Sequence, residues 1–165
     1  MKKILFVCLG NICRSPSAEA VFRGLVQKEG LDDEIKIDSA GITDYHAGEP
    51  ADERMQRHAS KRGYNLTSIS RPVGPDFDFK HFDMIIGMDD QNMRDLEKMA
   101  NGGPAVNKIF KITDFCSNCS YEEVPDPYYG GDEGFELVLD LLEEACKGLL
   151  RFLQTIPEEE AKSEE

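Results

Sequence analysis

The sequence predicts an α/β fold of three layers, in which a four-stranded parallel sheet is flanked by helices. Short apolar runs alternate with longer amphipathic segments along the chain, a pattern typical of parallel sheets covered on both faces. The length of 165 residues lies within the usual size of one domain, about 100 to 200 residues. We therefore expect one domain over residues 1–156, followed by an acidic, disordered tail over residues 157–165.

The first part of the chain predicts a strand, a tight loop and a helix, followed by a second strand, loop and helix. Residues 4–7 form an apolar run that stops at a Gly-Asn pair, as expected of a strand buried on both faces. A Ser-Pro pair at residues 15–16 begins a helix that runs to Gly30, because proline suits the first helical turn. Residues 34–39 alternate like a strand, and a helix is expected over residues 51–62.

The rest of the chain continues this alternation. Residues 82–88 predict a third buried strand and residues 90–100 a helix, and residues 107–112 predict a fourth strand. A long loop over residues 113–132 precedes a strongly apolar helix over residues 135–153. Ligands of open parallel sheets bind at the carboxyl ends of the strands, so we expect the functional loops to gather at that edge.

The charge of the protein restricts its partners. Lys and Arg number 19 against 32 Asp and Glu, which gives a formal net charge of -13. Nucleic acids and anionic membrane surfaces are repelled by this charge, so neither is an expected partner and any anion site must be local. We expect no secretory leader, because the first residues do not combine a basic start with a sufficiently long apolar stretch. No apolar run approaches the roughly 20 residues that span a bilayer. We expect a cytoplasmic protein.

A thiol and an arginine flank the turn between the first strand and the first helix. Cys8 is separated from Arg14 by the five residues Leu-Gly-Asn-Ile-Cys. Backbone N–H groups can point into such a turn, the Gly-Asn pair can accept a positive φ, and the helix amino end adds positive charge. The turn therefore predicts a cradle for an oxyanion. The residues expected to bind this anion are Leu9, Gly10, Asn11, Ile12, Cys13, Arg14 and Ser15.

Cys8 and Arg14 suit phosphoryl transfer. Arg14 can hold two phosphoryl oxygens through its planar guanidinium. The same positive field favours the thiolate of Cys8, which would then be the nucleophile. A free cysteine is more often a small buried hydrophobe. The strand before Cys8 and the Ser-Pro helix start after Arg14 favour the functional interpretation.

Residues 7–19, V-C-L-G-N-I-C-R-S-P-S-A-E, resemble the signature loop of the low-molecular-weight protein tyrosine phosphatases. Further segments that resemble the family follow in the same order at residues 38–41, 87–89 and 124–129. The resemblance implies a flavodoxin-like fold and hydrolysis of phosphotyrosine through a phosphocysteine on Cys8, without metal or organic cofactor. It also implies phosphotyrosine-containing proteins or peptides as substrates and inorganic phosphate as product.

The resemblance assigns roles by position. Asp126 would be the general acid that protonates the leaving phenolate, and then the base that activates water. Its sequence context alone indicates a turn, because Asp-Pro is a common turn dipeptide. Asn11 and Ser39 would hold the loop in shape, and Ser15 would stabilise the thiolate. Asp89 would orient side chains of the loop, although a helix N-cap explains it equally well.

Other polar residues are placed by resemblance or by spacing. Tyr45, Tyr128 and Tyr129 resemble the aromatic rim that encloses the substrate ring. In the family, a histidine supports the asparagine of the loop. In this sequence Ser68 stands at the corresponding position. The three histidines show no ligand spacing, so we expect them to be solvated or structural and expect no metal site. They are His46, His58 and His81.

The remaining cysteines have separate interpretations. Cys13 is a candidate redox residue, because a thiol close to Cys8 could capture its sulfenic acid as a disulfide, and the resemblance favours this role. Cys116 and Cys119 form a C-x-x-C without a second ligand pair, so we expect a reduced pair in a loop rather than a zinc site. Cys146 lies among leucines and is expected in the core.

Three alternative functions stay open. Protein arginine phosphatases usually carry a threonine at the position of Ile12. Arsenate reductases need resolving cysteines near the third strand, where this chain has Gly-Met-Asp at residues 87–89. A phosphopeptide-binding module that does not turn over is a third alternative. The joint presence of Cys8, Arg14 and Asp126 argues against that module.

Overall fold

A computed structural model describes residues 1–128 and 131–156. The predicted tail at residues 157–165 and the rim residue Tyr129 lie outside the described residues. At the centre is a four-stranded parallel sheet in the order β2-β1-β3-β4. Its strands are β1 (Lys2–Cys8), β2 (Ile35–Gly41), β3 (Met84–Gly87) and β4 (Ile109–Lys111). This order is that of flavodoxin-like folds, and the predicted fold class is confirmed.

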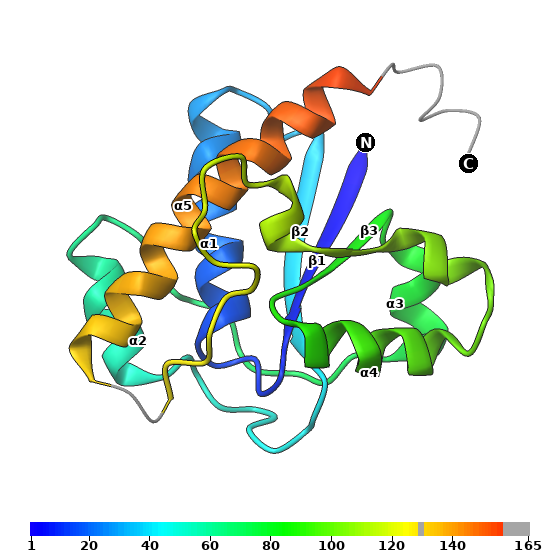
Figure 1. The fold of residues 1–165 in the computed structure, drawn as a ribbon, viewed down its shortest axis with the longest axis horizontal. Coiled ribbons are helices and arrows are strands. Elements are labelled where there is room, and N and C mark those ends of the chain that lie inside the picture. Colours follow the sequence, from blue (N-terminus) through cyan, green and yellow to red (C-terminus); the bar gives the residue numbers. More distant parts are fainter. Residues whose placement is uncertain (129–130, 157–165) are drawn as a thin grey trace.

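Helices cover both faces of the sheet (Figure 1). On one side lie α1 (Arg14–Lys28) and α5 (Asp132–Thr155), with α2 (Glu53–Ser60) packed beside α5. On the other side lie α3 (Pro75–His81) and α4 (Asp90–Ala100). The short 3-10 helices η1 (Pro104–Lys108) and η2 (Ile112–Phe115) flank β4.

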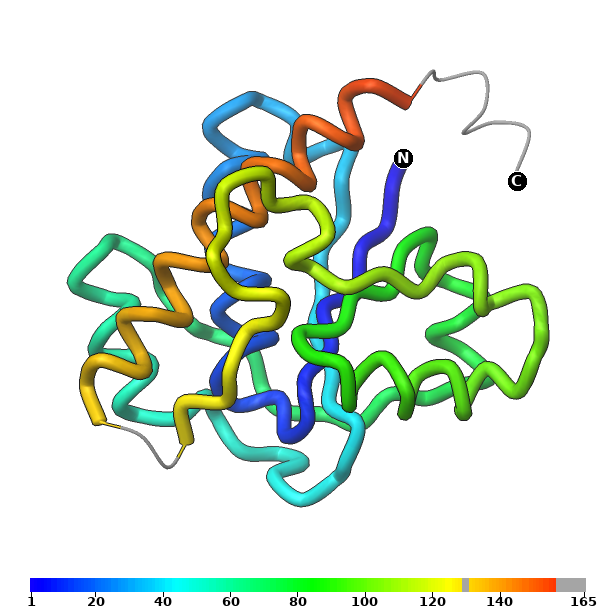
Figure 2. The backbone as a smooth tube through the Cα atoms, in the orientation of Figure 1, coloured from blue at the N-terminus to red at the C-terminus, as the bar shows by residue number. Residues whose placement is uncertain are grey.

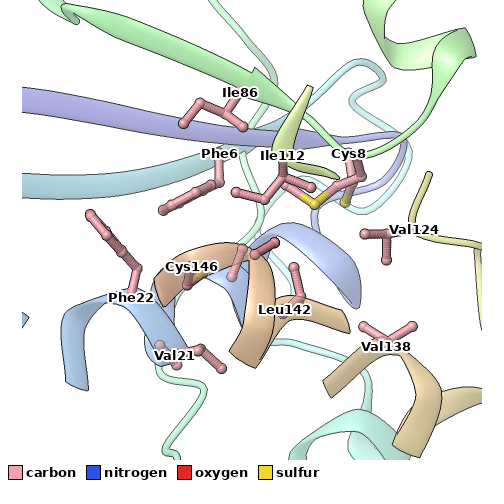
Figure 3. Close-up of a cluster of buried hydrophobic side chains, with 14 of the residues drawn as sticks. Phe6, Cys8, Val21, Phe22, Ile86, Ile112, Val124, Val138, Leu142 and Cys146 are labelled. Carbon is pink, nitrogen blue, oxygen red and sulfur yellow. The ribbon is translucent and has the colours of Figure 1, made fainter. Parts of the chain in front are cut away.

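The strand β1 is buried on both faces, as its continuous apolar run predicts. Ile4 and Phe6 join the core beneath α1 and α5, whereas Leu5 and Val7 join the core beneath α3 and α4. All four side chains are fully buried. Figure 3 shows the first of these cores, in which Phe6 and Ile86 project from the sheet toward Phe22, Leu142 and Cys146 on the helices. Cys146 lies in the core, as expected.

Gly148 allows α5 to approach the chain beyond β4. A Cβ atom added at Gly148 would overlap the carbonyl oxygen and carbon of Phe115. Only a glycine therefore permits this contact between α5 and η2. The contact anchors the start of the long connection from residue 116 to residue 128, which returns to the sheet edge.

The helix α3 was not predicted, because it depends on contacts from outside its own seven residues. The carboxylate of Asp78 accepts a hydrogen bond from Gly74 N at 2.7 Å and is held by the Arg71 guanidinium at 3.0 and 3.2 Å. Asp78 is 1 % exposed. A buried carboxylate paired in this way stabilises a helix that is too short to be stable alone.

The expectation of a reduced Cys116 and Cys119 pair was wrong for this structure. The two cysteines form a disulfide, with their Cα atoms 5.7 Å apart. Their loop brings the two Cα atoms to the separation usual for disulfides. Cys8, Cys13 and Cys146 are free.

Candidate active site

A pocket of about 420 Å³ opens at the carboxyl ends of β1 and β2. The turn after β1 and the loop after β2 meet at this edge, at the opposite end of β1 from the chain's amino terminus (Figure 2). The connection that follows η2 also reaches this edge. The pocket is lined by Cys8, Leu9, Gly10, Ile12, Cys13, Arg14, Thr43, Tyr45, His46, Asp126 and Tyr128. The predicted gathering of loops at this edge is thus observed.

Residues 8–15, here called the anion loop, fold around the sulfur of Cys8. The Ser15 Oγ lies 3.0 Å from Cys8 Sγ, and the backbone N–H of Asn11 donates to Cys8 Sγ at 3.3 Å. Cys8 is 3 % exposed and lies at the bottom of the pocket. Both contacts can donate a hydrogen bond to a thiolate, which is the form of cysteine that attacks electrophiles.

Asn11 holds the shape of the anion loop from inside. Its φ of 57° lies in the left-handed region that asparagine tolerates better than most residues. Its Nδ2 donates to Ser15 Oγ at 2.8 Å and to Ser39 Oγ at 3.1 Å. Ser39 Oγ in turn donates to Glu19 Oε1 at 2.6 Å. Asn11 Oδ1 accepts from Arg71 N at 3.1 Å, so both ends of the amide are satisfied.

A serine other than the expected one supports the anion loop. Ser70 Oγ donates to the carbonyl of Gly10 at 3.0 Å, and Ser70 is 4 % exposed. Ser68 was expected here, but it is only half-buried, and within the described residues its hydroxyl makes no hydrogen bond. Ser70 directly follows Ile69, which forms an isolated antiparallel bridge with Pro50.

Arg14 is fixed by hydrogen bonds to two other segments. Its Nη1 donates to Asp89 Oδ2 at 2.6 Å and to the carbonyl of Val124 at 3.0 Å. Burial alone would lower the pKa of Arg14, but the neighbouring Cys8, Asp89 and Asp126 raise it above its ordinary value. Arg14 is therefore a permanent cation that is 2 % exposed.

Asp89 has both of the roles considered for it. Its Oδ2 orients Arg14, while its Oδ1 accepts from Asn92 N at 2.7 Å and caps α4. The Asn92 side chain closes a capping box by accepting from Asp89 N at 3.2 Å. A single carboxylate thus couples the start of α4 to the arginine of the pocket.

Asp126 lies beside Arg14 in the wall of the pocket. Its Oδ2 lies 3.6 Å from Arg14 Nη2, and its Oδ1 accepts from Tyr128 N at 3.0 Å. The side chain of Asp126 is 43 % exposed, in contrast to the buried Arg14. Asp126 therefore forms a turn, as its sequence context indicates, and also presents a carboxyl oxygen to the pocket.

Aromatic residues surround the mouth of the pocket. Tyr45 is 84 % exposed. The ring of His46 lies between Tyr45 and Tyr128, with its centroid 6.2 and 6.3 Å from theirs. His46 Nδ1 pairs with Glu49 Oε2 at 2.7 Å. His46, which was expected to be solvated or structural, lies in the wall of the pocket. Its position directly after Tyr45 was the signal available in the sequence.

The other two histidines have structural contacts. His58 is 8 % exposed, stacks on Phe135 and lies between the carboxylates of Asp132 and Glu136. His81 packs against phenylalanine rings on either side of it. Both agree with the expectation.

Cys13 lies at the N-cap of α1 and is 4 % exposed. Burial raises the pKa of Cys13, and the nearby Asp52 and Cys8 raise it further. Cys13 is thus a neutral thiol at physiological pH. Its thiolate, which would be needed to attack an oxidised Cys8, is scarce under those conditions.

The anion loop offers several donors to an oxyanion. Among the described residues, the backbone N–H groups of Gly10, Ile12 and Cys13 have no hydrogen-bond acceptor. The first N–H groups of α1 also lack intrahelical partners, as at every helix start. With the Arg14 guanidinium, these donors form a site for a tetrahedral oxyanion above Cys8. The fold and the pocket therefore suit a protein of the phosphatase class.

Comparisons with known proteins agree with this class. Residues 3–162 match the family model described as low molecular weight phosphotyrosine protein phosphatase. A putative low molecular weight protein-tyrosine-phosphatase from Synechocystis is 46% identical over 92% of this chain and 96% of that protein. The chain belongs to the low molecular weight phosphotyrosine protein phosphatase family.

Solved structures extend the comparison. A protein tyrosine phosphatase from Entamoeba histolytica, crystallised with Hepes in its active site, has a TM-score of 0.90 at 49% identity, covering 93% of this chain and 97% of that one. A drosophila arginine phosphatase has a TM-score of 0.86 at 32% identity, covering 95% of this chain and 100% of that one. The fold is thus shared by phosphatases described with different substrates.

Proposed function

We propose that the protein hydrolyses phosphotyrosine in proteins or peptides in two steps, with Cys8 as nucleophile, Arg14 as phosphate ligand and Asp126 as acid and base. One observation carries this proposal. The thiol of Cys8, the guanidinium of Arg14 and the carboxyl of Asp126 line the same pocket, although Asp126 is remote from the other two in sequence.

In the first step, the Cys8 thiolate attacks the phosphorus atom and the bond to the phenolic oxygen breaks. Asp126, in its acid form, gives its proton to that oxygen. Arg14 and the N–H groups of the anion loop bind the three remaining phosphoryl oxygens, on which charge is spread in the transition state. Asp89 keeps the guanidinium in place for this contact.

In the second step, the Asp126 carboxylate removes a proton from water, which attacks the phosphocysteine. The phosphorus–sulfur bond breaks, phosphate leaves and the Cys8 thiolate is restored. Ser15 Oγ, 3.0 Å from Cys8 Sγ, donates a hydrogen bond to the departing sulfur. The same carboxyl thus serves both steps, and the cycle ends with its proton restored.

The pocket walls favour an aromatic ester. Ile12 and the rings of Tyr45 and Tyr128 form apolar walls above Cys8, and the long phosphotyrosine side chain reaches further than phosphoserine. We expect phosphopeptide substrates on this basis. A cytosolic location is also proposed, because the reaction needs Cys8 as a free thiol and cytosolic thiols are kept reduced. The disulfide of Cys116 and Cys119 stands against this location, because disulfides are rare in cytosolic proteins. No described helix is long and apolar enough to cross a membrane.

Arginine phosphatase activity is the second candidate. It is favoured by the likeness to the drosophila arginine phosphatase structure. Against it stands Ile12, which offers no hydroxyl to the pocket. Specificity of this kind depends on a few atoms of one side chain, so it must be measured.

Phosphate release from peptides of one sequence that carry phosphotyrosine, phosphoserine or phosphoarginine tests the proposal. We expect the highest kcat/KM for phosphotyrosine and a shift toward phosphoarginine in Ile12→Thr. A higher kcat/KM for phosphoarginine in the parent enzyme would move the protein to the second candidate. Tight binding of phosphotyrosine without release of phosphate would indicate a binding module instead.

A further inference from the structure

Asp126 lies in a short segment, residues 124–128, that is hydrogen-bonded to the body of the protein at both ends. At its start, Val124 N donates to Met88 O at 2.8 Å, and Val124 O accepts from Arg14 Nη1 at 3.0 Å. At its end, Tyr128 O accepts from Arg54 Nη2 at 2.9 Å. The Asp126 segment, as we call it, therefore depends on a side chain of α2 for part of its position.

Arg54 makes several contacts at this end. Its guanidinium lies 5.5 Å from the centroid of the Tyr128 ring and 5.0 Å from that of Phe135 on α5. Its Nη2 also pairs with Asp52 Oδ2 at 3.3 Å. A planar guanidinium can stack on rings and donate in its plane at the same time, which an ammonium cannot do.

Arg54 is also linked to the anion loop. Asp52 N donates to Ile12 O at 2.9 Å, and the Asp52 carboxylate caps α2 by accepting from Arg54 N and Met55 N at 2.9 and 3.2 Å. The start of α2 is thus fixed against the anion loop on one side. Through Arg54, it is fixed against the Asp126 segment on the other.

We infer that Arg54 is a positioning residue, which holds the Tyr128 end of the segment so that Asp126 reaches the leaving oxygen of the substrate. Asp126 Oδ1 accepts from Tyr128 N, so the turn from Asp126 to Tyr128 moves as one unit. A general acid must lie about 2.6–3.2 Å from its proton acceptor, so a small displacement of this turn removes its effect. The inference rests on the proposed function.

Leaving-group dependence of kcat/KM tests this inference. Phenyl phosphate needs a proton on its leaving oxygen, whereas 4-nitrophenyl phosphate, with a more acidic phenol, needs it less. We expect Arg54→Gln to lower kcat/KM roughly tenfold for phenyl phosphate, because displacement of a catalytic group by about 1 Å can cost up to ~100-fold. For 4-nitrophenyl phosphate we expect a change below about twofold. Arg54→Lys should fall between parent and Arg54→Gln.

The matched control is Arg57→Gln. Arg57 lies on the same helix with an exposed side chain, and its replacement removes the same charge without touching the Asp126 segment. Its ratio of the two kcat/KM values should equal that of the parent. This ratio does not depend on the amount of folded enzyme, so partial unfolding of Arg54→Gln cannot produce the expected effect. If Arg54→Gln does not fold, Arg54→Lys gives the same comparison.

A double-mutant cycle separates the inference from the proposed function. Asp126→Asn alone should show the leaving-group dependence, and Arg54→Gln added to Asp126→Asn should cause no further loss on phenyl phosphate. Equal slowing of both substrates by Asp126→Asn would overturn the acid role of Asp126. If Asp126→Asn behaves as expected, but the Arg54→Gln loss is equal for both substrates or multiplies with that of Asp126→Asn, the inference about Arg54 is wrong.

Discussion

The anion loop and the Asp126 segment form two walls of one pocket, but the protein holds them in different ways. The polar side chains of the loop are buried, with Asn11, Arg14 and Ser15 at 1 %, 2 % and 0 % exposure. They are hydrogen-bonded to one another and to neighbours such as Ser39 and Asp89. The Asp126 carboxyl is 43 % exposed, and its segment is held by hydrogen bonds to Arg14, Met88 and Arg54.

This difference indicates a division of work between the two walls. The buried loop is preorganised before substrate arrives, which is the condition for strong stabilisation of a charged transition state. In the proposed mechanism the exposed segment supplies a proton, and the gain in rate from that proton depends on the leaving group. Changes in the loop should therefore abolish turnover for every substrate, and changes in the segment should alter rates selectively.

The largest effect is expected at the sulfur in the loop. Cys8→Ser should fold and bind phosphate or vanadate, because the donors of the loop remain, but should lose at least about 10⁴-fold in turnover, as when other enzyme nucleophiles are removed. Calorimetric titration with the anion and steady-state kinetics with 4-nitrophenyl phosphate measure the two properties. Substantial residual hydrolysis would show that Cys8 is not the nucleophile.

The next effect is expected at Asp126. Asp126→Asn should slow phenyl phosphate by about 10²–10⁴-fold, the usual contribution of a general acid, and slow more acidic phenol esters less. A series of substituted phenyl phosphates gives this dependence as the slope of log kcat/KM against the pKa of the leaving phenol. If the slope for Asp126→Asn equals that of the parent, Asp126 has a structural role only and the distinction between the two walls is lost.

A packing change tests how the outer wall is anchored. In Gly148→Ala, the new Cβ would overlap the Phe115 carbonyl, where the connection to the Asp126 segment begins. We expect a loss of about 1–3 kcal/mol in the free energy of unfolding, measured by urea denaturation. Gly24→Ala is the control, because its Cβ would lie 3.8 Å from Tyr64, so that variant should gain up to about 1 kcal/mol. Equal behaviour of the two variants would refute the close contact.

The smallest effect concerns oxidation within the loop. Because burial raises the pKa of Cys13, its neutral thiol dominates at pH 7 and the thiolate fraction grows as pH rises. If Cys13 captures oxidised Cys8, disulfide formation after peroxide treatment should accelerate by up to about tenfold per pH unit between pH 7 and 9. Peptide mapping at each pH measures the disulfide. Recovery of Cys13→Ser from peroxide as full as that of the parent would exclude this redox role.

The two walls also differ in how far the sequence predicted them. The anion loop is encoded locally, by an apolar strand, a Gly-Asn turn and a Ser-Pro helix start, so its geometry followed from adjacent residues. The Asp-Pro dipeptide at Asp126 predicted only a turn, and the family resemblance alone indicated that Asp126 belongs to the active site. The turn and the pocket position are both present, since Asp126 Oδ1 accepts from Tyr128 N while Oδ2 faces Arg14.

Contacts between distant residues account for what the sequence did not predict. Arg54 and Tyr128 are 74 positions apart, and no local pattern on α2 indicates their hydrogen bond. Ser70 rather than Ser68 donates to Gly10 O, which is 60 positions away. Both contacts depend on tertiary packing. The disulfide of Cys116 and Cys119 is different, because it joins residues three positions apart and depends on the local path of the backbone between them.

The most direct test of the central claim is to trap the intermediate. The Asp126→Asn enzyme is mixed with a phosphotyrosine peptide, quenched in acid within the first turnover and digested for mass spectrometry. The two-step account predicts one phosphoryl group on the peptide that contains Cys8, and none in a Cys8→Ser, Asp126→Asn double variant. Phosphate release with no phosphoryl group on Cys8, or with one on another residue, would contradict it.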